Sequence, residues 1–170
     1  MTAPPALLLE MSDLEPAEYL AHRAVPHGCR LAVFTNERRG RRDLPRSHPE
    51  FATLGVIQLA ELATPDVIEI ADGTPSEPPL DLVARHRFVR TSRPGQGSLT
   101  GEATNGLQLV LISPRDPARA QELRDWADFV HIRHIAEAAV PGFGMITPYV
   151  NAAANGPRFL HYYELHTDDP

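Results

Sequence analysis

The sequence contains no lysine, because all sixteen of its basic residues are arginine. This absence excludes enzymes that form a Schiff base through lysine, enzymes that anchor pyridoxal phosphate, and nucleotide-binding proteins that need a phosphate-loop lysine. Cys29 is the only cysteine, so an intrachain disulfide cannot form and a thiolate metal cluster would need other chains. The sequence has no signal-peptide pattern and no apolar run long enough to span a membrane, which predicts a cytoplasmic protein.

Positive charge and aromatic residues are also scarce. The formal net charge is −6 and the pI is about 5.7. Nucleic acids and anionic membranes select basic surfaces, so neither is expected as a partner. Aromatic residues make up only 6% of the chain, and seven of the eleven lie between Trp126 and Tyr163. The second half is therefore richer in side chains that suit a planar, mostly apolar small molecule.

The chain nearly repeats itself. Residues 17–23 (Ala-Glu-Tyr-Leu-Ala-His-Arg) resemble residues 127–133 (Ala-Asp-Phe-Val-His-Ile-Arg). The match resumes at two later places, at Val25-Pro26 against Val140-Pro141 and at Asn36 against Asn151. Such a self-match indicates two copies of one supersecondary unit that pack against each other. His131 stands where the first copy has Ala21, so a single chemical centre is expected in the second half.

Hydrophobic periodicity predicts a similar order of elements in both halves. Strands are expected at 6–11, 30–35, 54–62, 82–90, 107–113, 144–150 and 158–165, and helices at 15–24, 65–71 and 117–139. This order predicts an α+β protein of two ferredoxin-like halves, 1–92 and 107–170, joined by a linker over 93–106. The second half stops at Pro170 before a fourth strand of its own. Because an unpaired strand edge invites another chain, a homodimer is expected.

Three motifs in the second half resemble the dimeric α/β-barrel superfamily, and its EthD-like members in particular. These members carry a tryptophan five residues before a histidine on the first helix, then a Val-Pro-Gly turn, then a strand reading roughly Pro-Arg-Tyr-Leu-x-x-Tyr-Glu-Leu. The corresponding segments here run from Trp126 to His131, from Val140 to Phe143, and from Pro157 to Leu165. Residues 107–165 match in order and spacing, whereas residues 6–90 match only in outline.

The resemblance implies that two four-stranded antiparallel sheets pack face to face as an intrachain α/β barrel. Helices would cover the outside, and a ligand cavity would lie between the sheets. Relatives include polyketide cyclases, cofactorless monooxygenases, lactone isomerases and haem enzymes, so the fold alone does not select an activity.

His131 is the expected catalytic base, because the resemblance places the family's histidine there. Imidazole titrates near neutrality and can move a proton without a cofactor. The alternative is a histidine that only hydrogen-bonds at the helix surface. His134, one helical turn further, is expected to bind substrate. A metal pair would need a third ligand such as His161 or His166, and helical zinc pairs sit four residues apart, so no metal is expected.

A strand over residues 158–165 supplies the other candidates. His161 and Tyr163 share one face of it, and this face is expected to line the cavity, although a one-residue slip would reverse the assignment. His161 and Tyr149 are expected to act with His131 in catalysis. The residues expected to contact substrate are Trp126, Tyr163, His134 and Phe143. The alternative is that the rings among them only fill the core.

Asp125 and Asp128 could orient a histidine, although acidic residues on helices are usually solvated.

These features predict a cofactor-independent cyclase, isomerase or lyase acting on an apolar, aromatic or polyketide-like molecule. His131 would abstract a proton next to a carbonyl, while Tyr149, His161 and Tyr163 would hold the enolate oxygen. The alternatives are a cofactorless monooxygenase, whose base forms a carbanion that reacts with oxygen, a haem protein, and a non-catalytic ligand carrier or assembly module.

Overall fold

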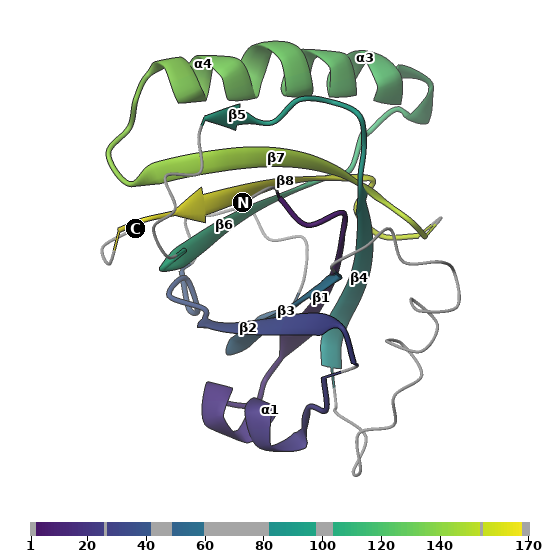
Figure 1. The fold of residues 1–170 in the computed structure, drawn as a ribbon. Coiled ribbons are helices and arrows are strands. Elements are labelled where there is room, and N and C mark those ends of the chain that lie inside the picture. The colour runs from purple at the N-terminus through teal and green to yellow at the C-terminus, as the bar shows by residue number, and fades with distance from the viewer. Residues whose placement is uncertain are drawn as a thin grey trace. The chain divides into compact units, whose positions relative to one another are not determined.

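The computed structural model describes residues 3–25, 27–41, 49–59, 82–97, 104–153 and 155–167. The chain divides into two compact units (Figure 1). The first unit is Pro4–Arg87, and the second is Phe88–Pro170 together with Met1–Ala3. Both contain helices and mainly antiparallel strands, so the predicted α+β class is confirmed. No helix among the described residues is long and apolar enough to cross a membrane.

The first unit is a sheet with one short helix against it (Figure 1). Its elements are β1 (Ala6–Ser12), α1 (Pro16–His22), β2 (Cys29–Thr35), β3 (Thr53–Leu59) and most of β4 (Leu82–Arg90). The strand order is β2-β3-β1-β4, and β3 is antiparallel to both of its neighbours. Every residue of β1 is buried, which explains its nearly continuous apolar sequence. The predicted helical segment 65–71 lies outside the described residues.

The second unit is a sheet covered by one long helical segment (Figure 1). Its strands are β5 (Gln96–Gly97), β6 (Gly106–Ile112), β7 (Phe143–Asn151) and β8 (Phe159–Leu165). The helical segment, here called the long helix, consists of η1 (Pro117–Arg119), α3 (Ala120–Trp126), η2 (Ala127–His131) and α4 (Ile132–Glu137). β8 lies between β7 and β6, and the end of β4 pairs with β7. The two-residue strand β5 falls within the range predicted to be a linker.

The closed barrel predicted from the resemblance is not found. The hydrogen-bonded order of the described strands is β2-β3-β1-β4-β7-β8-β6, with β5 beside β7. This order begins and ends on different strands, β2 and β6. A closed barrel needs its first and last strands to pair, so the strands that the structure describes form an open sheet.

Asn36 and Asn151, which match in the sequence repeat, make the same contacts in their two units. Asn36 follows β2 and Asn151 ends β7. The side-chain oxygen of each accepts a hydrogen bond from the backbone two residues on, at 3.1 Å from Arg38 and 2.8 Å from Ala153. Each side-chain amide donates to a carbonyl two residues before the next strand, that of Phe51 at 3.0 Å and that of Pro157 at 2.7 Å. The same residue type therefore closes both hairpins.

Candidate functional site

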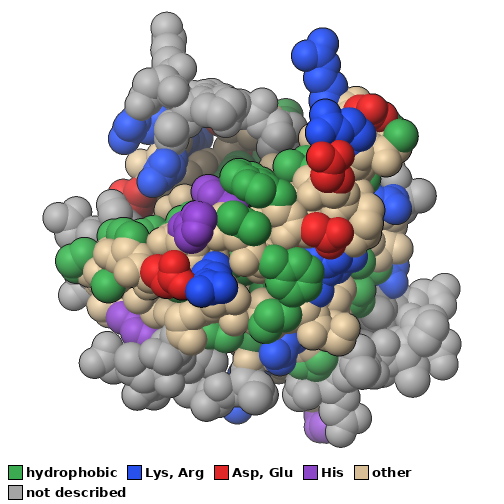
Figure 2. Space-filling model, turned by 90° about the horizontal axis from the view of Figure 1, so that it is seen from above, with side chains coloured by type: hydrophobic (Ala, Val, Ile, Leu, Met, Phe, Trp, Pro, Cys, Tyr) green, Lys and Arg blue, Asp and Glu red, His purple; other side chains and the backbone are tan. Residues whose placement is uncertain are grey.

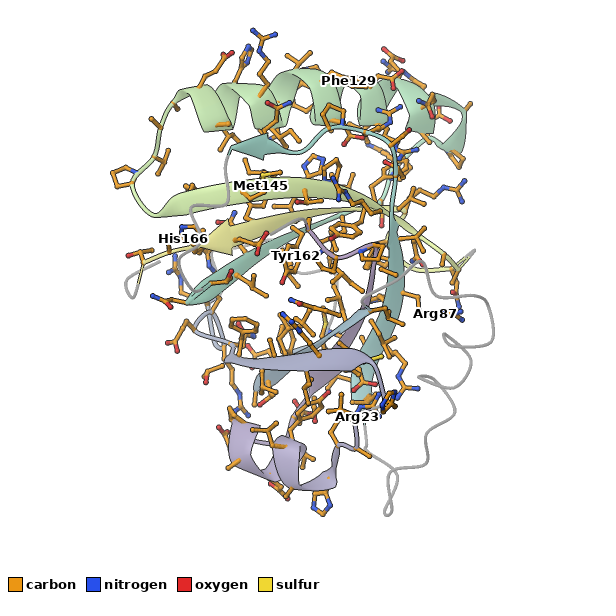
Figure 3. The ribbon with its side chains drawn as sticks, in the orientation of Figure 1. Arg23, Arg87, Phe129, Met145, Tyr162 and His166 are labelled. Carbon is orange, nitrogen blue, oxygen red and sulfur yellow. The ribbon has the colours of Figure 1, made fainter. Side chains whose placement is uncertain are left out.

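The sheet of the second unit has one face under the long helix and one face away from it. His161 and Tyr163 lie on the covered face, where Tyr163 packs with Ile132 and Ile146 in one apolar cluster. Tyr162 alternates to the opposite face, as Figure 3 shows. Tyr149 pairs with Leu160 across the ladder and so shares that opposite face. The structure therefore brings His161 and Tyr163 together and places Tyr149 on the other side of the sheet.

A buried carboxylate from the long helix meets a buried histidine from β8. Asp128 Oδ1 lies 2.8 Å from His161 Nε2, and the two residues are only 2% and 1% exposed. Arg93 Nη1 lies 3.1 Å and Arg124 Nε 3.4 Å from the other oxygen, Oδ2. A carboxylate buried in this way is stable only when it is paired and hydrogen-bonded. His161, Arg93 and Arg124 supply these contacts to Asp128. The pair fixes His161 through one ring nitrogen.

The other ring nitrogen of His161, Nδ1, is buried without a hydrogen-bond partner among the described residues. A neutral imidazole would offer a lone pair here, and a protonated one would offer an N–H group. Buried polar atoms are usually satisfied, so an orphaned one beside a paired acid marks a place where chemistry or a ligand fits. The neighbouring Tyr163 ring has its centroid 6.4 Å from that of His161, and burial raises the pKa of its hydroxyl.

The long helix is interrupted by one wide turn at this site. Residues Ala127–His131 form a π-helical turn between α3 and α4. A π-helical turn widens the spiral, and such insertions are frequent at functional sites. Asp128 and His131 both belong to this turn, with Asp128 fully buried and His131 half-buried. The turn thus carries the two polar residues of the helix that lie near His161.

His131 is held by the ring of Trp126. The two rings stack with their centroids 5.0 Å apart and their planes 17° from parallel. Burial lowers the pKa of His131 below its ordinary value, and the nearby charges of His161 and His134 lower it further. The ring is therefore neutral at neutral pH, the form in which an imidazole can accept a proton. Trp126 itself is 52% exposed, so solvent or a ligand can reach the stack.

The remaining predicted site residues have separate surroundings. Phe143 contacts the edge of the Tyr163 ring, with centroids 5.7 Å apart, and packs against the same apolar cluster. His134 is exposed on the outer side of the long helix. Tyr149 is buried against Tyr162, and burial raises the pKa of its hydroxyl well above the ordinary range. Of the predicted set, the covered face gathers His161, Tyr163 and Phe143, with the His131–Trp126 stack on the helix nearby.

The equivalent position in the first unit is occupied differently. In the second unit, His161 of β8 pairs with Val110 of β6. The pair at the same position in the ladder between β3 and β1 of the first unit is Gly55 with Glu10. A side chain on Gly55 would collide with the hydroxyl of Tyr19, so Tyr19 fills the space that an imidazole takes in the other unit. Glu10 there accepts hydrogen bonds from Tyr19 and Arg23 and forms an ion pair with Arg85. The first unit therefore has a saturated ion-pair cluster and no imidazole at this position.

Two residues of the site, Arg93 and Arg124, escaped the sequence analysis. Asp128 was predicted either to orient a histidine or to be solvated; it is buried beside His161, and His161 and two arginines compensate its charge. Arg93 falls in the predicted linker, yet it also pairs with Asp125 on the helix and lies over the Phe129 ring. The spacing of Arg124 and Asp128, four residues apart on a helix, was the only available signal.

No group of three or more histidine, cysteine or acidic residues in the described ranges could hold a metal ion. No protein-family model, curated protein or solved structure matches this chain. The function is therefore argued from the geometry of the site itself.

Proposed function

We propose that the protein is an enzyme that moves a proton on a small, mostly apolar carbonyl compound, with the reaction centred on the second unit. The observation that carries the proposal is the π-helical turn, which places a neutral, half-buried His131 beside the buried Asp128–His161 pair. Proton abstraction by a positioned imidazole contributes about a hundred- to ten-thousand-fold in rate.

The roles follow from the contacts. His131 takes a proton from the carbon next to the carbonyl, and the electrons of that C–H bond move into the enolate. Trp126, stacked on His131 and half exposed, offers a flat apolar surface for the substrate. His161, anchored on Asp128 through Nε2, presents its unpartnered Nδ1 to the reacting oxygen. Return of the proton from His131 to another atom gives an isomerisation. Attack of the enolate carbon on a second carbonyl of the same molecule gives a cyclisation, and the oxygen of that carbonyl then takes the proton from His131.

Tyr149 and His134 have no catalytic part in this proposal. Tyr149 lies on the sheet face opposite His161, and His134 is exposed on the helix.

Deuterium exchange tests the proposal without knowledge of the natural product. Aromatic 1,3-diketones serve as probes in heavy water, and mass spectrometry follows deuterium entering next to the carbonyl. His131→Gln is expected to slow the enzyme-dependent exchange by about a hundredfold or more, whereas His134→Gln, on the same helix, leaves it unchanged. Equal exchange by the wild type and His131→Gln would remove the mechanism. Oxygen consumption dependent on His131 would assign the monooxygenase reaction instead, and binding without exchange would assign a carrier.

We also propose that each unit is a ferredoxin-like half of the kind found in the dimeric α/β-barrel superfamily. The strand order β2-β3-β1-β4, with α1 between β1 and β2, supports this for the first unit. The order β7-β8-β6, with the long helix between β6 and β7, supports it for the second.

A further inference from the structure

The contacts of Asp128 decide which nitrogen of the His161 ring carries hydrogen. Oδ1 of Asp128 lies 2.8 Å from His161 Nε2, while Oδ2 lies 3.1 Å from Arg93 Nη1 and 3.4 Å from Arg124 Nε. Guanidinium groups only donate hydrogen bonds, so Asp128 meets both arginines as an ionised carboxylate and has no hydrogen to give to the imidazole. The hydrogen between Asp128 and His161 therefore belongs to Nε2 of the ring.

The charges around this pair favour a ring with a single hydrogen. Two positive charges, on Arg93 and Arg124, face two negative charges, on Asp128 and Asp125. A second proton on His161, whose side chain is only 1% exposed, would add a buried positive charge to a group that is already balanced. In the neutral ring Nδ1 carries a lone pair, and Nδ1 is the atom without a hydrogen-bond partner among the described residues. The unpartnered atom of the site is thus a hydrogen-bond acceptor.

A buried acceptor selects what can bind beside it. The oxygen of a ketone or an ether has only lone pairs, which the lone pair of Nδ1 repels, whereas a hydroxyl group donates its hydrogen. The surroundings are largely apolar, because the neighbouring Tyr163 ring packs with Ile132 and Ile146. A ligand that leaves a buried polar atom unpaired in such surroundings loses affinity. The fitting ligand therefore brings an O–H group to Nδ1.

The surface over the long helix suits the remaining, apolar part of such a ligand. Trp126 and Phe129 are 52% and 47% exposed, and Figure 2, which views the molecule from above, shows hydrophobic side chains next to histidines on this surface. Arg93 lies over the Phe129 ring, 4.9 Å from its centroid, so the ring is fixed before a ligand arrives. His131 stacks on Trp126 and lies close enough to His161 for the charge of His161 to lower its pKa.

We propose that Nδ1 of His161 is a subsite for a hydroxyl group, so that the protein takes its carbonyl compound in the enol form or with an aromatic hydroxyl. The inference rests on the proposed function for the place of the substrate, but it does not depend on proton transfer by His131. Arg93 and Arg124 are then positioning residues. They hold Asp128 as an acceptor, Asp128 fixes the hydrogen on Nε2, and Nδ1 faces the hydroxyl with its lone pair.

Nitrogen-15 NMR of the histidine side chains tests the tautomer without any ligand. At about pH 8, His161 of the wild type should carry its hydrogen on Nε2, with the signals assigned from their loss in His161→Gln. Asp128→Asn should move the hydrogen to Nδ1, because the two arginines keep the amide oxygen on their side and the amide N–H group then faces Nε2. Asp125→Asn is the matched control, since it removes a half-exposed acid that also pairs with Arg93, and it should leave the tautomer unchanged.

The wild-type spectrum decides the tautomer even when Asp128→Asn does not fold. A wild-type His161 that carries hydrogen on Nδ1, alone or together with Nε2, would overturn the inference.

Two probes of similar shape test the subsite itself. Naphthol carries a hydroxyl group, and its methyl ether lacks the hydrogen that Nδ1 accepts. In calorimetric titrations the wild type should bind naphthol about tenfold or more tightly than the ether. Asp128→Asn should lose this preference, because both probes can accept from an N–H group at Nδ1, whereas Asp125→Asn should keep it.

Equal affinity of the wild type for the two probes, or binding of neither, would overturn the subsite. The deuterium-exchange result with His131→Gln is separate, because the loss of a catalytic base slows exchange without changing the preference for a hydroxyl group.

Discussion

Replacing Arg23 by methionine tests whether the buried ion-pair cluster of the first unit holds that unit together. Glu10 is fully buried in β1 and Arg23 is 5% exposed. The Arg23 guanidinium binds both carboxylate oxygens, with Nε 2.8 Å from Oε2 and Nη2 3.0 Å from Oε1. Methionine keeps the length and apolar character of the stem but removes the charge, both hydrogen bonds to Glu10 and the one to the Ala24 carbonyl. Glu10 would then keep only Tyr19 and Arg85 as its partners from this cluster.

The expected loss of folding free energy follows from the burial of the remaining charge. Removing one partner of a buried ion pair costs about 3–5 kcal/mol, because the other charge stays buried without full compensation. The Tyr19 hydroxyl at 2.5 Å and Arg85 at 2.8 Å continue to bind Glu10, which places the expected cost near the lower end, at about 3 kcal/mol.

Urea denaturation followed by far-ultraviolet circular dichroism measures this cost. With an m value of about 1–3 kcal/mol/M, the midpoint should fall by about 1–3 M. Arg39→Met is the matched control, because Arg39 pairs with Glu15 at 3.1 Å on the surface, with side chains 49% and 68% exposed. Exposed pairs contribute about 0–1 kcal/mol, so this variant should unfold near the wild-type midpoint.

A double variant separates the ion pair from general packing. Glu10→Leu together with Arg23→Met removes the charges of the buried pair. Arg85 also loses Glu10, but its side chain is 34% exposed to water, so the remaining cost is mainly that of the Tyr19 hydroxyl losing its acceptor, about 1–3 kcal/mol. The double variant should therefore unfold no earlier than Arg23→Met alone. A cost below about 1 kcal/mol for Arg23→Met, or a double variant that costs as much as the two single variants combined, would refute this reasoning.

Two further predictions concern Gly55 and His131. Gly55→Ala should lower the free energy of unfolding by about 1–3 kcal/mol in a thermal melt, because the new methyl group would displace Tyr19 from its place over β3. Gly106→Ala is the control and should cost less, because its Cβ would make only ordinary contacts at 3.6 Å. His131 should titrate by NMR at a pH below its ordinary value of about 6.5. The unfolded chain then binds the proton more tightly, so the free energy of unfolding should rise with pH up to about 6.5, and His131→Gln should flatten this rise. A pKa of His131 in the folded protein that is at or above its pKa in the urea-unfolded chain would contradict the burial argument.

Local patterns in the sequence predicted most of the secondary structure. The long apolar runs that became β1, β6 and β8, and the helical periodicity from Pro117 onward, each depend on neighbouring residues and are legible in one chain. The two-residue strand β5 carries no such periodicity, since its pairing with Met145 and Ile146 depends on β7.

The centre of the site depends on long-range contacts, which local patterns do not contain. Asp128 and His161 are 33 residues apart and meet only after the long helix packs on β8. The sequence repeat aligned Tyr19 with Phe129, yet Tyr19 is buried and Phe129 is 47% exposed. The π-helical turn at Ala127–His131 accompanies this difference, because its wider spiral changes which residues of the long helix face the sheet.

The matched asparagines leave the hairpin tips free to change in length. Asn36 and Asn151 tie the base of each hairpin to the strand that returns, with the backbone N–H of Asn36 also 2.8 Å from the Ala52 oxygen and that of Asn151 3.0 Å from the Arg158 oxygen. The chain between the tied ends is much longer in the first unit than in the second. Each doubling of a flexible loop costs only about 0.6 kcal/mol once its ends are held. These two tips are therefore natural places to graft a peptide epitope or an affinity tag without disturbing the strands.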